Sequence, residues 1–230
     1  MDDHDGSAAA RSLHERRMRQ GWRIAGRKIG FTNRSLWPLY GVYQPIWGFV
    51  YRETLIRAEN GRASVELTGL AQPRIEPEVC FGLKRPPRSS DPDELLDCLE
   101  WVAHAIELVQ CTLPGWKGVT VANSTAENGL HGRLVLGTPR ALPRGLREAL
   151  PRMEITLKRG STVVDRGQGE NVLGSPLLAL AHLVDLKVGL EAGELITTGT
   201  LTDAHPVAPG ERWSTEIRGL EIDGLQVEFR

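Results

Sequence analysis

The sequence has only three cysteines, Cys80, Cys98 and Cys111, and no Cys-x-x-Cys pair. Thiols so few and so scattered exclude a disulfide framework or a zinc knuckle and are typical of reduced, buried cysteines. The sequence also lacks an apolar run near the roughly 20 residues that a transmembrane helix needs. Its acidic start, MDDHDG, lacks the basic and then apolar pattern of a signal peptide. We therefore predict a soluble, cytoplasmic protein without a membrane partner.

A charge imbalance and the common nucleotide-binding patterns are also missing. The formal net charge is −1, so no basic surface indicates a nucleic-acid partner. The sequence has no Walker loop, no Gly-x-Gly-x-x-Gly and no Gly-x-Ser-x-Gly, so nothing indicates a bound nucleotide or a serine nucleophile. A hydrophobic content of 40% over 230 residues is ordinary for one large globular domain with its own core.

Apolar alternation and turn residues predict many strands and two or three helices, without the regular strand–helix repeat of a parallel sheet. The fold class that fits this pattern is α+β. Helices are predicted over residues 12–20, 91–102 and 174–186. Strands are predicted over residues 22–32, 75–83, 105–109, 153–159, 162–166, 194–200, 212–218 and 225–229. Because the first residues carry few apolar anchors, we predict disorder over residues 1–10. Residues 1–14 then form a disordered or short N-terminal extension, and residues 15–230 a single domain.

Glu76 and Glu78 lie in a segment, Pro73–Arg85, that is otherwise typical of an apolar strand. Alternate strand residues face one side, so the two carboxylates repel each other unless a cation, a proton or bases lie between them. A solvated strand face would also explain such a pair. Glu107, however, lies in the apolar segment AIELV, where an unpaired charge is costly. Three carboxylates on apolar strands suit a hard cation such as Mg²⁺ or Mn²⁺, and we predict that one binds here.

Lys28 lies between Gly26 and Gly30, and glycine beside a reactive group permits close approach of the backbone. A solvated lysine is the ordinary alternative. The segment of residues 119–132 is polar for the middle of a chain, and its side chains could line a site; the candidates are Ser124, Asn128 and His131.

Several segments, taken in their order along the chain, resemble the 2-keto-4-pentenoate hydratase and 4-oxalocrotonate decarboxylase family of the fumarylacetoacetate hydrolase superfamily. The resemblance runs from about Glu15 to the C-terminus. The segments are Gly26-Arg-Lys-Ile-Gly-Phe-Thr32, Gly41-Val-x-x-Pro45-x-x-Gly48, the Glu-x-Glu strand, Ala105-Ile-Glu-Leu-Val109, Ala126-Glu-Asn128, Leu173-Gly-Ser-Pro176 and Leu190-x-Ala-Gly-Glu-Leu-Ile-x-x-Gly-Thr-Leu-Thr202.

The resemblance implies a mixed β-roll with a few flanking helices, and Mg²⁺ or Mn²⁺ bound by Glu76, Glu78 and Glu107. It also implies that Lys28 is the active-site lysine. We expect a small 2-oxo acid as partner, a homo-oligomer, and an association with a sister enzyme of the same pathway, such as one of aromatic-compound catabolism. A nearby divalent cation should lower the pKa of Lys28, so that a neutral amine can move protons as general acid/base.

The expected reaction is hydration of a 2-hydroxypenta-2,4-dienoate-like acid through an enolate that the metal stabilises. Glu127 is one candidate for ordering the water. Further side chains are assigned to substrate binding: Thr32, Ser124, Asn128, Ser175, Thr198 and Thr200.

The sequence departs from the family pattern at three positions where acids are frequent, which here hold Gln44, Gln110 and Asn123. An altered substrate is therefore an open alternative. A 4-oxalocrotonate-type decarboxylase needs the same enolate and is a second alternative. A C–C hydrolase, or an altered family member that serves as a binding or assembly partner, is a third.

Overall fold

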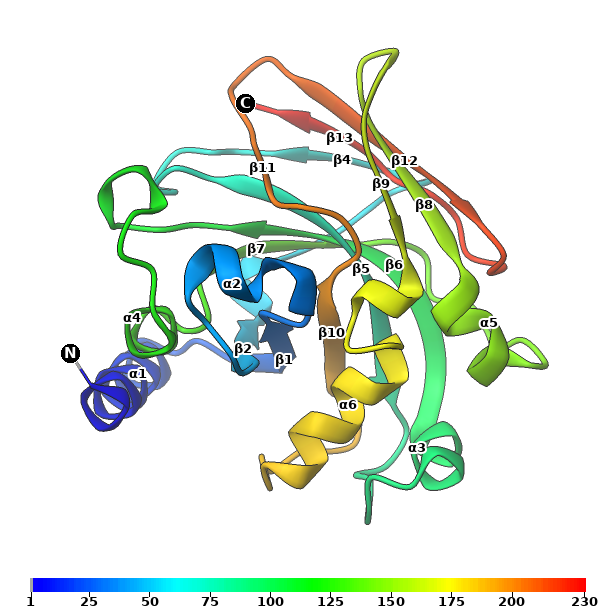
Figure 1. Cartoon of the computed structure of the whole chain (residues 1–230), viewed down its shortest axis with the longest axis horizontal. Coiled ribbons are helices and arrows are strands. Elements are labelled where there is room, and N and C mark those ends of the chain that lie inside the picture. The colour runs from blue at the N-terminus through cyan, green and yellow to red at the C-terminus, as the bar shows by residue number, and fades with distance from the viewer. Residues whose placement is uncertain (1) are drawn as a thin grey trace.

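The computed structural model describes residues 2–230, which form two stacked β-sheets with helices around them (Figure 1). The larger sheet has the order β2-β1-β10-β5-β6-β7-β3, with β11 paired to β5, and the smaller has the order β4-β13-β12-β8-β9. The strands of the larger sheet are β1 (Ile24–Gly30), β2 (Ile46–Tyr51), β3 (Leu55–Arg57), β5 (Arg74–Leu83), β6 (Leu99–Val109), β7 (His131–Leu136), β10 (Leu195–Thr200) and β11 (His205–Pro206). Those of the smaller sheet are β4 (Arg62–Val65), β8 (Glu154–Arg159), β9 (Thr162–Gln168), β12 (Arg212–Arg218) and β13 (Gln226–Phe229).

The helices gather in two places around the larger sheet (Figure 1). Three of them contact one another and share a core cluster with strands of this sheet; they are α3 (Pro92–Cys98), α5 (Leu146–Arg152) and α6 (Pro176–Asp185). On the other side of the molecule α1 packs against α4, and the short α2 precedes β2; their bounds are Asp3–Arg19 (α1), Trp37–Tyr40 (α2) and Val121–Ala126 (α4). Among residues 2–230, no helix combines the length and the apolar character that a bilayer crossing requires.

Strand β5 shows how the larger sheet is buried on both faces. Its odd-numbered residues face the core: Ile75 clusters with Trp213 of the smaller sheet, and Phe81 clusters with Leu180 of α6. The opposite face carries Cys80, which belongs to a separate apolar cluster formed within the larger sheet. The acids of β5 share this second face because strand residues alternate. The α+β class and the mixed sheets predicted from the sequence are thus confirmed.

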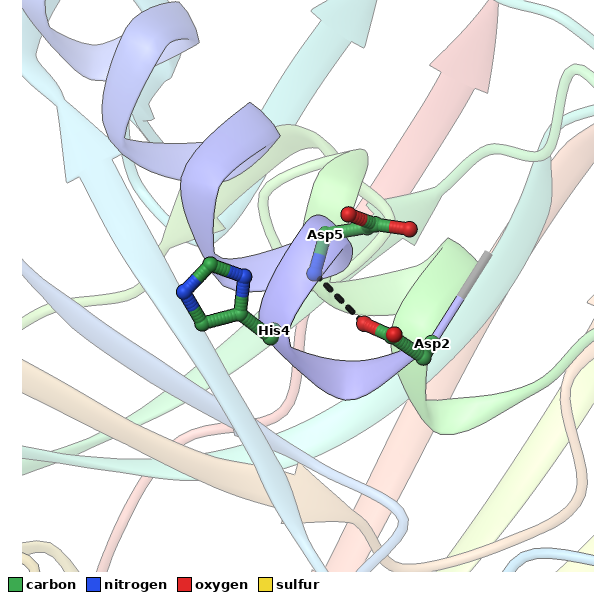
Figure 2. A group of neighbouring side chains, drawn as sticks. All are labelled: Asp2, His4 and Asp5. Atoms are coloured by element: carbon green, nitrogen blue, oxygen red, sulfur yellow. Dashed lines mark hydrogen bonds between the residues drawn. The ribbon is translucent and has the colours of Figure 1, made fainter.

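The disorder predicted for residues 1–10 is wrong from Asp2 onward, because Asp2 caps a helix, α1, that runs unbroken over Asp3–Arg19; residue 1 lies outside the described residues. The side chain of Asp2 caps this helix by accepting a hydrogen bond from the Asp5 backbone N–H at 2.8 Å (Figure 2). Acids in the first turn and arginines in the last favour the helix dipole. Close packing on α4 replaces the missing apolar anchors: a Cβ at Gly6 would lie 2.5 Å from the Ala122 carbonyl oxygen.

The helix predicted over residues 91–102 is too long at its C-terminal end. The capping acid Asp91 and the following proline start α3 as expected, but the helix ends at Cys98. Leu99 and Val102, predicted to continue its buried stripe, lie in β6, where both are buried. A buried leucine or valine suits either element, so burial alone did not locate the boundary.

Candidate functional site

Glu76, Glu78 and Glu107 meet on the face of the larger sheet that also carries Cys80. In the antiparallel pairing of β5 with β6, Glu76 lies directly opposite Glu107, and Glu78 lies opposite Ala105. A carboxylate oxygen from each of the three glutamates lies within 4.8 Å of the other two. Glu78 and Glu107 are fully buried. The predicted carboxylate cluster is therefore assembled by strand register, although the three residues span a long stretch of sequence.

The side chain of Glu78 is held on one of its two oxygens. The Thr197 hydroxyl and the Gly199 backbone N–H both donate to Glu78 Oε2, the latter at 2.9 Å. Gly199 has φ +101° and packs so tightly that a Cβ would lie 1.9 Å from Thr32 Oγ1, so only glycine fits there. Glu78 Oε1 has no hydrogen-bond partner among the described residues. One oxygen is thus anchored and the other is free to bind a ligand.

Lys28 reaches the same cluster from β1, and only 2% of its surface is exposed. Its Nζ donates to the Gly129 carbonyl oxygen at 2.8 Å and lies 3.1 Å from Glu107 Oε2. The glycines around it permit this approach: a Cβ would lie 2.9 Å from Lys28 Cδ at Gly129 and 3.1 Å from Nζ at Gly30. The structure thus places a buried amine against a buried carboxylate.

The three carboxylates of this cluster outnumber the one ammonium group beside them, and burial shifts the pKa of each acid. Burial raises the pKa of Glu76 to about 7 and that of Glu78 well above its usual range. Burial also opposes ionisation of Glu107, but Lys28 and His131 outweigh it, so the pKa of Glu107 is lowered. For Lys28 burial favours the neutral amine, yet the three glutamates outweigh burial and raise its pKa. The lowered pKa predicted for Lys28 beside a cation remains a prediction.

A divalent cation fits this set of residues. Three carboxylates around one ammonium group leave negative charge in a buried place, which is costly unless a cation neutralises it. Glu78 Oε1 is a buried oxygen without a hydrogen-bond partner among the described residues, and Glu107 Oε2 is paired there only with the ammonium group of Lys28. An all-oxygen ligand set of this charge suits Mg²⁺ or Mn²⁺. A second group of possible ligands, Asp2, His4 and Asp5, is fully exposed (Figure 2), and Asp2 already caps α1.

The raised pKa of Glu76 predicts how the stability of the metal-free protein depends on pH. In the folded state its pKa of about 7 lies above the ordinary value of 4.5, so between these values the folded protein binds more protons than the unfolded chain. The free energy of unfolding of the protein should therefore fall as the pH rises through this window, by on the order of 3 kcal/mol from this group.

Thermal unfolding of chelator-treated protein, with and without Mg²⁺, measures this effect. Protons compete with the cation for the glutamates, so Mg²⁺ should raise Tm more at about pH 8 than at about pH 5. A larger Tm increase by Mg²⁺ at about pH 5 than at about pH 8 would contradict the assignment of Glu76 as a metal-binding carboxylate with a raised pKa.

A cavity of about 220 Å³ opens onto the cluster and contains Lys28 and Glu76 in its wall. Arg74, two residues before Glu76, also lines it, with its guanidinium 4.6 Å from the ring centre of Trp116. The guanidinium of Arg74 donates to the Ala204 carbonyl oxygen at 3.3 Å, and its charge favours ionisation of the nearby Glu76. No ion pair with a carboxylate is present at Arg74 among the described residues, so its charge can attract an acidic ligand into this cavity.

Two of the residues predicted to bind substrate line the cavity, Thr32 and Thr200. Thr32 Oγ1 is buried and has no hydrogen-bond partner among residues 2–230, so it can donate to a ligand. The Thr200 hydroxyl donates to the Thr202 carbonyl oxygen. The other predicted hydroxyl of β10, that of Thr198, donates to the Val79 carbonyl oxygen and joins two strands.

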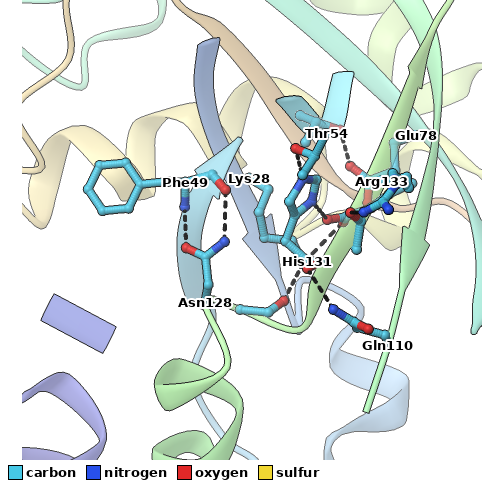
Figure 3. Close-up of polar contacts among 12 residues, drawn as sticks. Lys28, Phe49, Thr54, Glu78, Gln110, Asn128, His131 and Arg133 are labelled. Carbon is cyan, nitrogen blue, oxygen red and sulfur yellow. Dashed lines mark hydrogen bonds and ion pairs between the residues drawn. The ribbon is translucent and has the colours of Figure 1, made fainter. Parts of the chain in front are cut away.

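The remaining predicted residues lie outside the cavity wall. Asn128 bonds both backbone groups of Phe49, with distances of 2.8 and 2.9 Å (Figure 3). Ser175 is the N-cap residue of α6, and Ser124 is buried in α4. Glu127 accepts hydrogen bonds from the backbone N–H and the hydroxyl of Thr112. In this arrangement its carboxylate is engaged away from Lys28, and ordering of water by Glu127 stays a prediction.

Sequence reasoning missed the side chains that support the glutamates, and also Arg74. Thr197 and Gly199 were seen as part of a strand, and only the register of β10 against β5 brings them to Glu78. His131 was expected to line a site but instead bonds Glu107 from behind, with Nδ1 2.7 Å from Oε1. Arg74 offered a usable signal, since it lies two residues before Glu76 and therefore on the same face of the strand.

The chain is similar in sequence and in fold to known proteins. Residues 43–225 match the family described as fumarylacetoacetate (FAA) hydrolase C-terminal. The chain is 31% identical to a 2-hydroxyhexa-2,4-dienoate hydratase of Comamonas testosteroni, covering 94% of this chain and 83% of the relative. It is 32% identical to a 2-keto-4-pentenoate hydratase of Paraburkholderia xenovorans, covering 98% and 83% respectively.

Among solved structures, the 4-oxalocrotonate decarboxylase from Pseudomonas putida G7 complexed with magnesium and adipate superposes with a TM-score of 0.87. The two are 26% identical, and the match covers 100% of this chain and 87% of that one. A fumarylpyruvate hydrolase from Pseudomonas aeruginosa in complex with Mn²⁺ and pyruvate has a TM-score of 0.71 at 13% identity, covering 88% of each chain. This second likeness concerns the fold alone.

Proposed function

Because this chain belongs to the fumarylacetoacetate hydrolase family, we propose that it is a metal-dependent lyase that hydrates a small 2-hydroxydienoic acid, such as 2-hydroxypenta-2,4-dienoate. The observation that carries the proposal is the buried cluster of three carboxylates in contact with Lys28, at the wall of a cavity lined by Arg74. The hydratases to which the chain is about 30% identical support the choice of reaction.

Glu76, Glu78 and Glu107 would hold Mg²⁺ or Mn²⁺. When bound, the cation supplies Lewis-acid stabilisation of the negative charge that develops at the 2-oxo group of the substrate. The 4-oxalocrotonate decarboxylase of known structure, which is complexed with magnesium, supports a divalent ion.

The residues of the chain have separate tasks in this proposal. Lys28 Nζ holds or moves the proton that interconverts the dienol and the α,β-unsaturated ketone, to which water then adds. Its almost complete burial keeps solvent from competing for that proton. The hydroxyl of Thr32, which has no other partner among the described residues, donates to an oxygen of the substrate. Arg74 attracts the acid into the cavity by its charge.

Decarboxylation of a 4-oxalocrotonate-type acid is the second candidate. The structural similarity to a 4-oxalocrotonate decarboxylase over the whole chain favours it. So does Arg74, because a guanidinium without a carboxylate partner suits the second acidic group of a dicarboxylic substrate. Both candidates need the same stabilised enolate and differ in whether water is added or CO₂ departs.

A substrate panel with added Mg²⁺ or Mn²⁺ tests the proposal. Loss of dienol absorbance is followed for mono- and dicarboxylic 2-hydroxydienoic acids, and CO₂ release is measured in parallel. Consumption of a monocarboxylic dienoate without CO₂ release is the result expected for the hydratase. Release of CO₂ from a dicarboxylic acid would instead identify the decarboxylase. Absence of turnover on every compound, with a protein that binds metal, would contradict both.

A further inference from the structure

Behind Glu107, on the side away from Lys28, lies a buried pair of polar side chains, His131 and Thr54. His131 Nδ1 is 2.7 Å from Glu107 Oε1, and its Nε2 is 2.8 Å from Thr54 Oγ1. Figure 3 shows the imidazole ring directed at Thr54. The exposed fraction is 2% for His131 and 3% for Thr54. Neither side chain lines the cavity, so neither is placed to touch a substrate.

The number of hydrogens that Glu107, His131 and Thr54 carry determines which group donates in each of the two hydrogen bonds. An ionised Glu107 can only accept, so Nδ1 of His131 must carry the proton of the 2.7 Å bond. In a neutral ring, which burial favours, Nε2 then has only a lone pair. The hydroxyl of Thr54 must therefore donate to Nε2.

The Thr54 hydroxyl is fixed by the backbone next to it. Its oxygen accepts from the Tyr51 N–H at 3.3 Å. The hydroxyl is also within donating distance of the Tyr51 carbonyl oxygen, at 3.0 Å, but its single hydrogen cannot serve both acceptors. If it pointed at Tyr51, the Thr54 oxygen would face the lone pair of Nε2 across 2.8 Å with no hydrogen between them, so it points at Nε2. The chain of bonds thus runs from the Tyr51 backbone through Thr54 and His131 to Glu107.

We propose that Thr54 and His131 are positioning residues that fix the carboxylate of Glu107 for the cation. This inference rests on the proposed function, in which Glu107 is a metal ligand. With Oε1 held by His131, rotation of the carboxylate is blocked, and Oε2 stays directed at the side occupied by Lys28 Nζ, 3.1 Å away. Thr54 acts through His131: by donating to Nε2 it holds the ring in the orientation in which the Nδ1 proton points at the glutamate.

Without His131 and Thr54, Lys28 would be the remaining contact of the Glu107 carboxylate, and the carboxylate could rotate. Partners that orient a metal-binding side chain typically contribute about 10- to 100-fold in metal affinity. Metal affinity should fall in the variants that remove a hydrogen-bond donor and persist in those that keep one. A general packing defect would not follow that pattern.

Two matched pairs of substitutions test the proposal by calorimetric titration of the chelator-treated protein with Mn²⁺. Thr54→Val removes the hydroxyl at nearly constant shape, and Thr54→Ser keeps it. His131→Ala removes the ring, whereas His131→Asn keeps a donor near the position of Nδ1. We expect about 10-fold weaker binding or more in Thr54→Val and His131→Ala, and affinities closer to the original protein in Thr54→Ser and His131→Asn.

Nitrogen NMR of the histidine rings gives a readout that packing alone would not move. His131 should carry its proton on Nδ1 in the original protein and in Thr54→Ser, whereas in Thr54→Val the unprotonated Nε2 loses its hydrogen bond and its nitrogen resonance should shift. Equal Mn²⁺ affinities in all four variants, or a proton on Nε2 in the original protein, would overturn the inference and leave the proposed function intact. Failure of the original protein to bind Mn²⁺ or Mg²⁺ would instead overturn the proposed function, and this inference with it.

Discussion

Replacing Glu78 by glutamine is expected to abolish binding of Mg²⁺ and Mn²⁺ and to lower turnover by about 100-fold or more. Glutamine has nearly the same shape, and its amide oxygen can still accept from the Gly199 N–H, which now donates to Glu78 Oε2 at 2.9 Å. The fold should therefore persist. What is lost is a charge on a fully buried side chain whose other oxygen has no partner among the described residues.

The measurement is calorimetric titration of the chelator-treated variant, with turnover assayed at high metal concentration. Glu100→Gln is the matched control, because Glu100 lies on β6 but is exposed and far along the strand from Glu107. It should bind metal as the original protein does. The same titration on Glu76→Gln and Glu107→Gln extends the test. Unchanged affinity in all three cluster variants would contradict the assignment of the metal site.

The members of the carboxylate cluster could be predicted because two local sequence patterns indicate them. Strand alternation puts Glu76 and Glu78 on one face, and the apolar neighbours of Glu107 indicate a buried strand. The register that sets Glu76 opposite Glu107 is a property of the paired strands. No pattern within either strand specifies it, so the sequence predicted the members of the site without their geometry.

The side chains that support the glutamates and the first half of the N-terminal helix could not be predicted, because tertiary contacts determine them. His131 is the first residue of β7 and reaches Glu107 only because β7 pairs with β6. Helix α1 was predicted only from residue 12 onward, because its first half buries only Gly6, against α4, and shows no apolar stripe. Asn128 was expected near substrate, but it bonds the backbone of Phe49, a use that an amide side chain serves equally well.

Substitution of Lys28 is expected to cause the second large loss of turnover. The choice of substitution distinguishes proton transfer from simple attraction of the acidic substrate. In the metal-free protein the glutamates outweigh burial and raise its pKa. A bound cation neutralises those glutamates, while the burial that favours a neutral amine remains. We therefore expect the bound cation to lower the pKa of Lys28, which would let its amine take and return a proton.

Lys28→Arg should therefore lose nearly as much turnover as Lys28→Ala, about 10²- to 10⁴-fold, because a guanidinium stays protonated at any workable pH. The space around Lys28 is narrow, with Gly129 and Gly30 in close contact, so steric damage by arginine must be separated from lost proton transfer. Lys28→Met provides this control, since it has a similar length, no charge and no extra width. If Lys28 moves protons, arginine and methionine should both fail, while Mn²⁺ affinity and Tm stay close to those of the original protein. Near-original turnover in Lys28→Arg, with loss only in Lys28→Met, would show that the charge acts by attraction and would remove the acid/base role.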